Sequence, residues 1–144
     1  MKADKSLMSE LRHTASNRKI LDLGALRTQR QHARSNGKTV VHCHGCFDIV
    51  HPGHIRYLQF ARQQGDVLIV SITGDPHVNK GESRPYIPQE LRAENLAALE
   101  FVDFVFINPT PTAVELLSTL RPDIYLKGRE YEHNSKSADW YWAL

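Results

Sequence analysis

The sequence predicts an α/β fold, a Rossmann-like open parallel sheet with helices on both faces, and three observations carry this prediction. Short runs rich in β-branched and apolar residues, beginning with 39–43, alternate with longer segments of helical periodicity. The run 67–72 is apolar on both faces, which is typical of a parallel strand covered by helices. One helical segment joins these two strands, and such a βαβ unit is right-handed. We therefore expect a ligand at the carboxyl edge of this sheet.

The remaining elements follow in chain order. We expect further strands at 101–107 and 124–126 and helices at 21–33, 55–62, 92–100 and 110–120. Arg92 opens the third of these helices, and its inward residues are expected to be Leu91, Asn95, Leu96 and Leu99. Thr110 before Pro111 places a hydroxyl at the N-cap of the last helix and proline at its first position, although Thr112 could also serve as the cap.

Length and composition favour one domain. The chain has 144 residues, and its polar first segment predicts a flexible N-terminal arm over 1–20 and a single domain over 21–144. No apolar run approaches the roughly 20 residues that cross a bilayer, which favours a cytoplasmic protein with no membrane contact. Residues 1–36 hold eight Lys and Arg against three Asp and Glu. Without interleaved aromatic residues this excess is expected to be a solvated face, so no nucleic-acid partner is expected.

The stretch 45–54, Gly-Cys-Phe-Asp-Ile-Val-His-Pro-Gly-His, connects the first strand to its helix. Pro52 fits the first helical turn because its missing N–H costs nothing there, and Gly53 lets a ligand approach the backbone. The free N–H groups and the positive end of the helix dipole then face an anion. His51 and His54, one turn apart, add donors aimed at the same place. The sequence therefore predicts a phosphate-binding corner, and the plainer alternative is two surface histidines at a helix start.

Cys43 and Cys46 form a C-x-x-C pair, which raises zinc binding and thiol redox chemistry as alternatives. A closed zinc site takes four ligands, usually on a turn, whereas His42 and Cys43 on one strand point to opposite faces. Redox chemistry of this motif requires an exposed first cysteine at a helix N-terminus, and Cys43 lies in the strand. We expect buried structural thiols and no metal site, and both alternatives stay open.

The motif H-x-G-H after G-x-F-D resembles the signature of the nucleotidyltransferase superfamily, which contains the cytidylyltransferases and the adenylyltransferase domain of ADP-heptose synthase. H-x-G-H alone is a weak signal, whereas the whole string 45–54 in its strand-turn-helix setting is specific. The resemblance covers about residues 21–134. It implies catalytic roles for His51 and His54. It also implies a nucleotide site that includes Gly45, Cys46, Phe47, Asp48 and Gly53.

Two later loops are similar to those of the heptose-type enzymes. In the stretch from Lys80 to Arg92, the resemblance implies that Lys80 closes over the triphosphate as a catalytic cation and that Arg92 binds the nucleotide's phosphates. The second loop resembles the family's K-G-x-D-Y and lies against the nucleoside. It adds Lys127, Gly128, Arg129 and Glu130 to the nucleotide site. Glu130 replaces the family's aspartate, which lengthens the side chain but keeps its charge.

The C-terminal segment departs from the family pattern. The family continues with another strand and a final helix that opens on S-[ST]-T, whereas 132–144 contains no such motif. We therefore expect a domain shortened at its C-terminus, with the family's last strand and helix missing. The aromatic residues Trp140, Tyr141 and Trp142 are expected to pack on the domain or on another chain, which leaves a homodimer open.

The resemblance implies a nucleotidyltransferase that joins a nucleoside triphosphate, with ATP favoured, to a sugar phosphate, with heptose 1-phosphate favoured, and releases pyrophosphate. The attacking phosphate oxygen is already ionised, so catalysis needs positioning and charge neutralisation rather than a strong base. Mg²⁺ is expected as a cofactor carried by the triphosphate. CTP with glycerol 3-phosphate is the second substrate pair. A nucleotide-binding module without turnover is the alternative from another class.

Overall fold

The computed structural model describes residues 17–79, 81–127 and 141–143. The helices are α2 (Leu23–Ser35), α3 (Pro52–Gln63), α4 (Gln89–Ala97) and α5 (Val114–Leu120), with short 3₁₀ turns η1 (Asn17–Lys19) and η2 (Asp75–His77). The strands are β1 (Val40–Gly45), β2 (Val67–Thr73), β3 (Phe104–Asn108), β4 (Ile124–Leu126) and β5 (Tyr141–Ala143). Within this described part, no helix has both the length and the apolar character that a membrane span requires.

The strands form one sheet in the order β3-β2-β1-β4-β5. β1 lies parallel to both β2 and β4, β2 lies parallel to β3, and β5 runs antiparallel to β4. The chain moves outward from β1 through β2 to β3 and then crosses to the other side of β1, so the strand order reverses between β1 and β4. Open α/β sheets bind ligands beside such a reversal, at the carboxyl ends of the strands. This topology confirms the predicted Rossmann-like parallel sheet, and only the antiparallel edge strand β5 was not expected.

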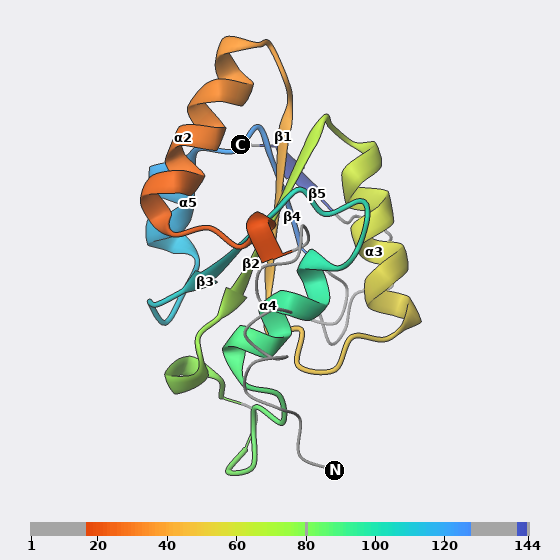
Figure 1. The fold of residues 1–144 in the computed structure, drawn as a ribbon, viewed down its shortest axis with the longest axis vertical. Coiled ribbons are helices and arrows are strands. Elements are labelled where there is room, and N and C mark those ends of the chain that lie inside the picture. Colours follow the sequence, from red (N-terminus) through yellow and green to blue (C-terminus); the bar gives the residue numbers. More distant parts are fainter. Residues whose placement is uncertain (1–16, 80, 128–140, 144) are drawn as a thin grey trace.

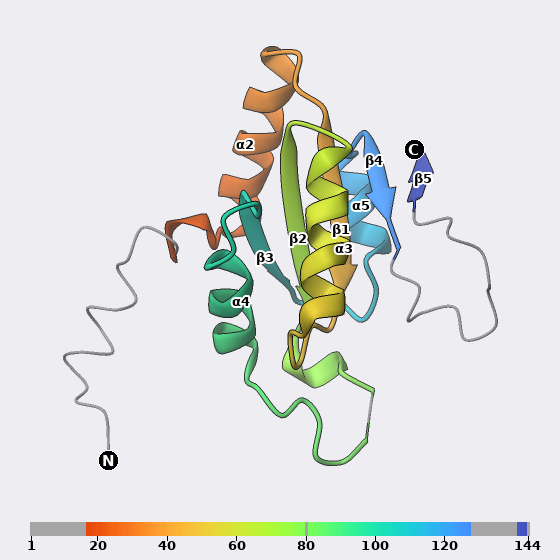
Figure 2. The ribbon, with the colours of Figure 1, turned by 90° about the vertical axis from the view of Figure 1, so that its right-hand side faces the viewer.

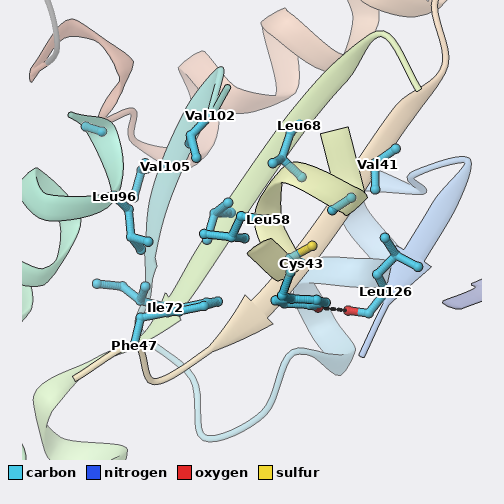
Figure 3. Close-up of a cluster of buried hydrophobic side chains, with 14 of the residues drawn as sticks. Val41, Cys43, Phe47, Leu58, Leu68, Ile72, Leu96, Val102, Val105 and Leu126 are labelled. Carbon is cyan, nitrogen blue, oxygen red and sulfur yellow. Dashed lines mark hydrogen bonds between the residues drawn. The ribbon is translucent and has the colours of Figure 1, made fainter. Parts of the chain in front are cut away.

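Helices cover both faces of the sheet (Figure 1 and Figure 2). The larger core cluster joins α3 and α4 to one face, and Figure 3 shows its side chains converging between those helices and the strands. Its fully buried members include Val41, Leu58, Leu68, Leu96 and Val105. The smaller cluster joins α2 and α5 to the other face and includes Leu26, Val40, Ile69 and Leu120. Adjacent residues such as Val40 and Val41 belong to different clusters because side chains alternate along a strand.

Helix α4 begins earlier than expected and presents a different face to the core. It starts at Gln89, so Arg92 lies one turn inside it. Arg92 and Ala93 are fully buried, whereas Leu91 is 42% exposed and Asn95 is also exposed. The inward placement of Leu91 and Asn95 was therefore wrong. The inward position is taken by Arg92, whose guanidinium donates to acceptors in neighbouring segments, and an apolar pattern does not reveal such partners.

Helix α5 is shorter than expected at its N-terminal end. It begins at Val114 after the N-cap residue Ala113, so the N-cap predicted at Thr110 was wrong. The Thr110 hydroxyl instead lies within hydrogen-bond distance of two acceptors, Oδ1 of Asn108 at 3.1 Å and the Thr112 carbonyl at 2.8 Å. These bonds fold 108–112 into a loop at the carboxyl end of β3, beside the entrance of the candidate site.

Residues 17–20, at the end of the predicted arm, lie against the domain. The Lys19 ammonium donates to the Leu99 carbonyl at 3.0 Å, and Ile20 forms a parallel bridge with Val105. The backbone N–H of Leu21 then donates to the Val105 carbonyl at 2.9 Å. This segment therefore partly covers the outer edge of β3, which reduces the exposure of its unpaired backbone groups.

Candidate functional site

The corner between β1 and α3 is a tight, buried turn. β1 ends at Gly45, and Cys46, Phe47 and Asp48 are all buried immediately after it. Phe47 has a φ of 50°, in the left-handed region that bulky residues rarely adopt. Its ring packs edge-on against the His54 ring at 5.4 Å between centroids. The core contact of Phe47 therefore holds a strained backbone that turns the chain from the strand into the helix.

His51 and His54 are held together by reciprocal caps at the N-terminus of α3. Nδ1 of His51 accepts the Gly53 N–H at 3.1 Å, and Nδ1 of His54 accepts the His51 N–H at 3.3 Å. Their rings stack with centroids 3.8 Å apart. Because both Nδ1 atoms accept, the N–H of each ring lies at Nε2, which is therefore a donor atom. The structure brings the two predicted histidines together, as a phosphate-binding corner requires.

Gly53 has a role that the sequence did not reveal. A Cβ at this position would lie 2.8 Å from Cε1 and 3.0 Å from Nδ1 of His51. The absence of a side chain at Gly53 therefore allows the His51 ring to fold back over the first helical turn.

Replacing Gly53 by alanine is expected to displace the His51 ring while α3 remains intact, because alanine is a good helix former. We expect the Nδ1 cap to be lost and turnover to fall in parallel with that of a His51 variant. Histidine NMR signals and steady-state kinetics measure the two effects. An alanine variant with unchanged His51 signals would contradict this account.

Asp48 ties the next loop to the corner. One carboxylate oxygen accepts from Arg84 Nε at 2.6 Å and from the Tyr86 N–H at 2.9 Å, and the other accepts from the Ile87 N–H at 2.9 Å. The Arg84 guanidinium also lies 4.4 Å from the centre of the Tyr86 ring. Asp48 was predicted to contact the nucleotide, and the structure shows it as the anchor of the loop that follows Lys80.

These hydrogen bonds to backbone and Arg84 outweigh burial and hold the pKa of Asp48 below its usual range. The stability from this anchor is therefore complete above the ordinary aspartate pKa of about 3.9 and is lost as the pH falls through the lowered value. Asp48→Asn should release the loop at neutral pH and speed chymotrypsin cleavage after Tyr86, which is 59% exposed. The difference in urea midpoint between wild type and Asp48→Asn should shrink as the pH falls through that range.

Asp103→Asn is the matched control for this cleavage experiment. Asp103 accepts the Leu68 N–H at 2.7 Å and pairs with Arg62 at 3.2 Å, at the opposite edge of the sheet. The Asp103→Asn substitution should lower the overall stability of the fold without accelerating cleavage after Tyr86. Equal acceleration in both variants would show that global unfolding, rather than release of the Asp48 anchor, exposes the bond.

Arg92 joins the segments around the corner from inside. Its guanidinium donates to the carbonyls of Ile87, Cys46 and Thr73 at 2.9, 2.9 and 2.8 Å and to the Asp75 carboxylate at 2.6 Å. These bonds use four of its five N–H donors. The structure thus places Arg92, predicted to bind phosphate, among protein acceptors beneath the site.

A pocket of about 530 Å³ opens beside the corner, at the carboxyl ends of β1 and β4 where the strand order reverses. Its walls come from the end of β1, the η2 segment, the start of α5, and β4. They include Gly45, Cys46, His44, Thr73, Thr112, Tyr125 and Lys127. The pocket therefore includes three of the predicted site residues, and His51 and His54 lie on the α3 side of the same corner.

Sequence analysis missed a polar row along this pocket. His42 is fully buried, and its Nε2 lies 2.7 Å from Ser71 Oγ, which also lies 2.7 Å from Nδ1 of His44. Nε2 of His44 lies 3.4 Å from Thr73 Oγ1. The available signal was the alternation of polar residues, at 42 and 44 and at 71 and 73, within otherwise apolar strands.

The two cysteines form no disulfide and are buried, and burial raises the pKa of Cys43 to about 12. Such a thiol does not form a reactive thiolate near neutral pH. No cluster of three or more His, Cys, Asp or Glu side chains suited to a metal ion occurs within 17–79, 81–127 and 141–143. Lys80, Gly128, Arg129 and Glu130 lie outside the described residues, so their predicted roles remain predictions.

Comparisons with known proteins agree with this geometry. A family model described as Cytidylyltransferase-like matches residues 42–142. The chain is 50% identical over 117 residues to Bifunctional protein HldE of Campylobacter fetus subsp. fetus, covering 79% of this chain and 24% of that protein. It is 42% identical to Bifunctional protein HldE of Citrifermentans bemidjiense, covering 90% and 27%. The chain thus spans about a quarter of the length of these relatives.

A solved structure supports the same relationship. The lipopolysaccharide core biosynthesis protein of Thermoplasma volcanium aligns with a TM-score of 0.60 and 27% identity, covering 70% of this chain and 80% of that one. The shared architecture includes the parallel sheet on which the corner and the pocket are built.

Proposed function

The chain belongs to the cytidylyltransferase-like family, and we propose that it is a nucleotidyltransferase that condenses ATP with a sugar phosphate and releases pyrophosphate. Heptose 1-phosphate is the favoured acceptor, because the stretches 80–92 and 127–131 resemble those of the heptose-type enzymes. The similarity to a lipopolysaccharide core biosynthesis protein supports this choice. CTP with glycerol 3-phosphate is the second pair to be tested. A need for nucleoside triphosphate agrees with the cytoplasmic location expected from the sequence.

The stacked pair His51 and His54 carries this proposal. The two Nε2–H donors of these rings lie at the start of α3, where backbone N–H groups and the helix dipole also favour an anion. Charge moves onto the leaving pyrophosphate during the transfer, so donors fixed beforehand stabilise the transition state more than the ground state. The attacking acceptor phosphate is already ionised at neutral pH, so these residues need not remove a proton from it.

The pocket beside the corner supports a second substrate. Its volume of about 530 Å³ falls within the range of small-molecule sites, and it shares Gly45 and Cys46 with the corner. An acceptor in this pocket would lie beside the corner at which we propose that the nucleotide's phosphates bind. Positioning two reactants in this way supplies much of the rate enhancement in phosphoryl and nucleotidyl transfer.

The described residues do not form a protein site for Mg²⁺. The Asp48 carboxylate is occupied by Arg84 and two backbone donors, and the Asp75 carboxylate accepts from Arg92 and from the Gln89 N–H at 3.2 Å. We propose that Mg²⁺ enters as part of the nucleotide, coordinated by its phosphates, and that the protein acts on this complex.

Thermal-shift measurements with ATP, CTP, GTP and UTP, each with Mg²⁺, test the proposal first. A ligand at 100 times its Kd stabilises the folded state by about 2.7 kcal/mol, so the preferred nucleotide should stand out. Pyrophosphate release is then measured with heptose 1-phosphate and with glycerol 3-phosphate. A nucleotide-dependent shift without pyrophosphate release from either acceptor would identify a binding module rather than an enzyme.

A further inference from the structure

The row His42, Ser71 and His44 leads from the interior of the sheet to the wall of the pocket. His44 on β1 lies opposite Ser71 on the neighbouring strand β2. His42, also on β1, lies opposite Tyr125 on β4. His42 is fully buried, and its Nδ1 has no hydrogen-bond partner among the described residues. His44 is only partly buried and lines the pocket. The fully buried His42 is thus linked through Ser71 to His44, which lines the pocket.

The unpartnered nitrogen determines the direction of the hydrogen bonds. The Ser71 hydroxyl has one proton, so it donates to one histidine and accepts from the other. If Ser71 donated to His42, then Nδ1 of His42 would carry a buried proton with no acceptor, which is costly and rare. In the other direction, His42 donates Nε2–H to Ser71, Ser71 donates to Nδ1 of His44, and only a bare acceptor lacks a partner. This second direction is therefore favoured.

That direction places the proton of His44 on Nε2, which lies beside Thr73, another residue of the pocket wall. The contact from Nε2 to Thr73 Oγ1 is 3.4 Å, which is long for a hydrogen bond, so a ligand oxygen could replace it. Burial lowers the pKa of His42 to about 3 and that of His44 to about 4. Both rings are therefore neutral at physiological pH, and His44 offers a single uncharged donor.

We propose that His44 is a specificity-determining residue that donates Nε2–H to a hydroxyl or ring oxygen of the acceptor, and that Ser71 and His42 hold it in this tautomer. This inference rests on the proposed function, because it assigns one end of the pocket to the sugar or polyol part of the acceptor. Thr73 and Tyr125 are neutral residues of the same pocket wall and suit such an oxygen. Lys127, which follows β4 at the level of His44, supplies a cation for the acceptor's phosphate in the same pocket. A site built to bind a hydroxyl rejects ligands that lack one, because its own donor is then left unpaired.

The tautomer is tested directly by ¹⁵N NMR of histidine-labelled protein. At pH 7 both His42 and His44 should be neutral with the proton on Nε2, and Ser71→Ala should convert His44 to a mixture of tautomers. Ser71→Thr, which keeps the hydroxyl, should retain the wild-type pattern and guards against a general folding defect. A wild-type His44 that carries its proton on Nδ1 would overturn the proposal.

The consequence for specificity is tested by calorimetric titration with heptose 1-phosphate, glycerol 3-phosphate and inorganic phosphate. Ser71→Ala should weaken binding of whichever sugar or polyol phosphate the wild type prefers by about tenfold, the equivalent of one hydrogen bond. It should leave the affinities for inorganic phosphate and ATP unchanged. Ser118→Ala, an exposed serine on α5, is the matched control and should alter none of them.

The outcomes separate this inference from the proposed function. If Ser71→Ala weakens all three phosphates equally, or if neither sugar nor polyol phosphate binds the wild type, the role assigned to His44 is wrong. The absence of both nucleotide binding and pyrophosphate release would instead overturn the nucleotidyltransferase proposal, and the tautomer measurement does not depend on it.

Discussion

Alanine at His51 or at His54 is expected to lower kcat by about 10² to 10³, with a modest loss of nucleotide affinity. Each substitution removes an Nε2–H donor that is fixed at the N-terminus of α3 before the reaction begins. By analogy with the loss of one oxyanion donor, the transition state should lose about 3–4 kcal/mol of stabilisation. Because this benefit grows as charge reaches the leaving pyrophosphate, it should appear in kcat more than in KM. Steady-state kinetics on whichever substrate pair turns over provide the measurement.

Alanine also removes a cap, so a second variant must separate chemistry from folding. Losing the His51 cap alone should lower stability by about 1 kcal/mol. Asparagine at His51 can accept the Gly53 N–H with its side-chain oxygen, as Nδ1 does now, but it lacks the Nε2–H donor. His51→Asn should therefore keep the wild-type melting temperature and lose as much kcat as His51→Ala. Exposed His32, replaced by alanine, is the control for removing an imidazole.

Wild-type kcat in the asparagine variant would contradict the mechanism. Substitutions at His54 should lower stability more than those at His51, because the His54 ring is buried and packs against Phe47. There His54→Asn is the more informative variant, since alanine would also leave a cavity. Retained turnover in both asparagine variants would mean that the histidines shape the corner and do not act on phosphate.

The sequence predicted the sheet and the corner because both depend on local patterns. β-branched runs at β1 and β2 have the period and length of buried strands, and Pro52 with the two histidines marks the helix start. The stacking of His51 on His54 follows directly from their spacing of one turn. These features depend on residues that are close together in the chain, so a single sequence is sufficient to predict them.

The features that sequence analysis missed depend on contacts between distant segments. Arg92 was placed correctly on a helix, but its partners come from the corner, the end of β2 and η2, and no spacing rule connects them. Asp48 likewise meets a loop 36 to 39 residues later. The sequence did not reveal the row of His42, Ser71 and His44, because a histidine in an apolar strand is usually a core residue with its hydrogen bonds satisfied. Only the register between β1 and β2 brings Ser71 between the two rings.

Substitution of Arg92 is the second change for which we expect a large effect, and this effect is on the stability of the fold. Arg92→Met should lower the free energy of unfolding by about 1–3 kcal/mol, because it removes the donor of the buried Cys46 carbonyl and of the partly buried Thr73 and Ile87 carbonyls, together with the ion pair to Asp75. Arg92→Lys should lie between Met and wild type, since one ammonium cannot reach acceptors on four segments. Urea denaturation with a constant m-value measures both changes.

Arg30 provides the matched control, because it is a second buried arginine far from the corner. Its guanidinium donates to the carbonyls of Leu120 and Arg121 at 3.1 and 2.6 Å and pairs with Asp123 at 3.4 Å. Arg30→Met should destabilise the fold and leave the Kd for nucleotide unchanged. Arg92→Met should both destabilise the fold and weaken nucleotide binding, because it loosens Cys46 and the corner. If Arg92→Lys instead melted like the wild type and bound nucleotide poorly, the guanidinium would contact phosphate directly, and the scaffold role assigned here would be wrong.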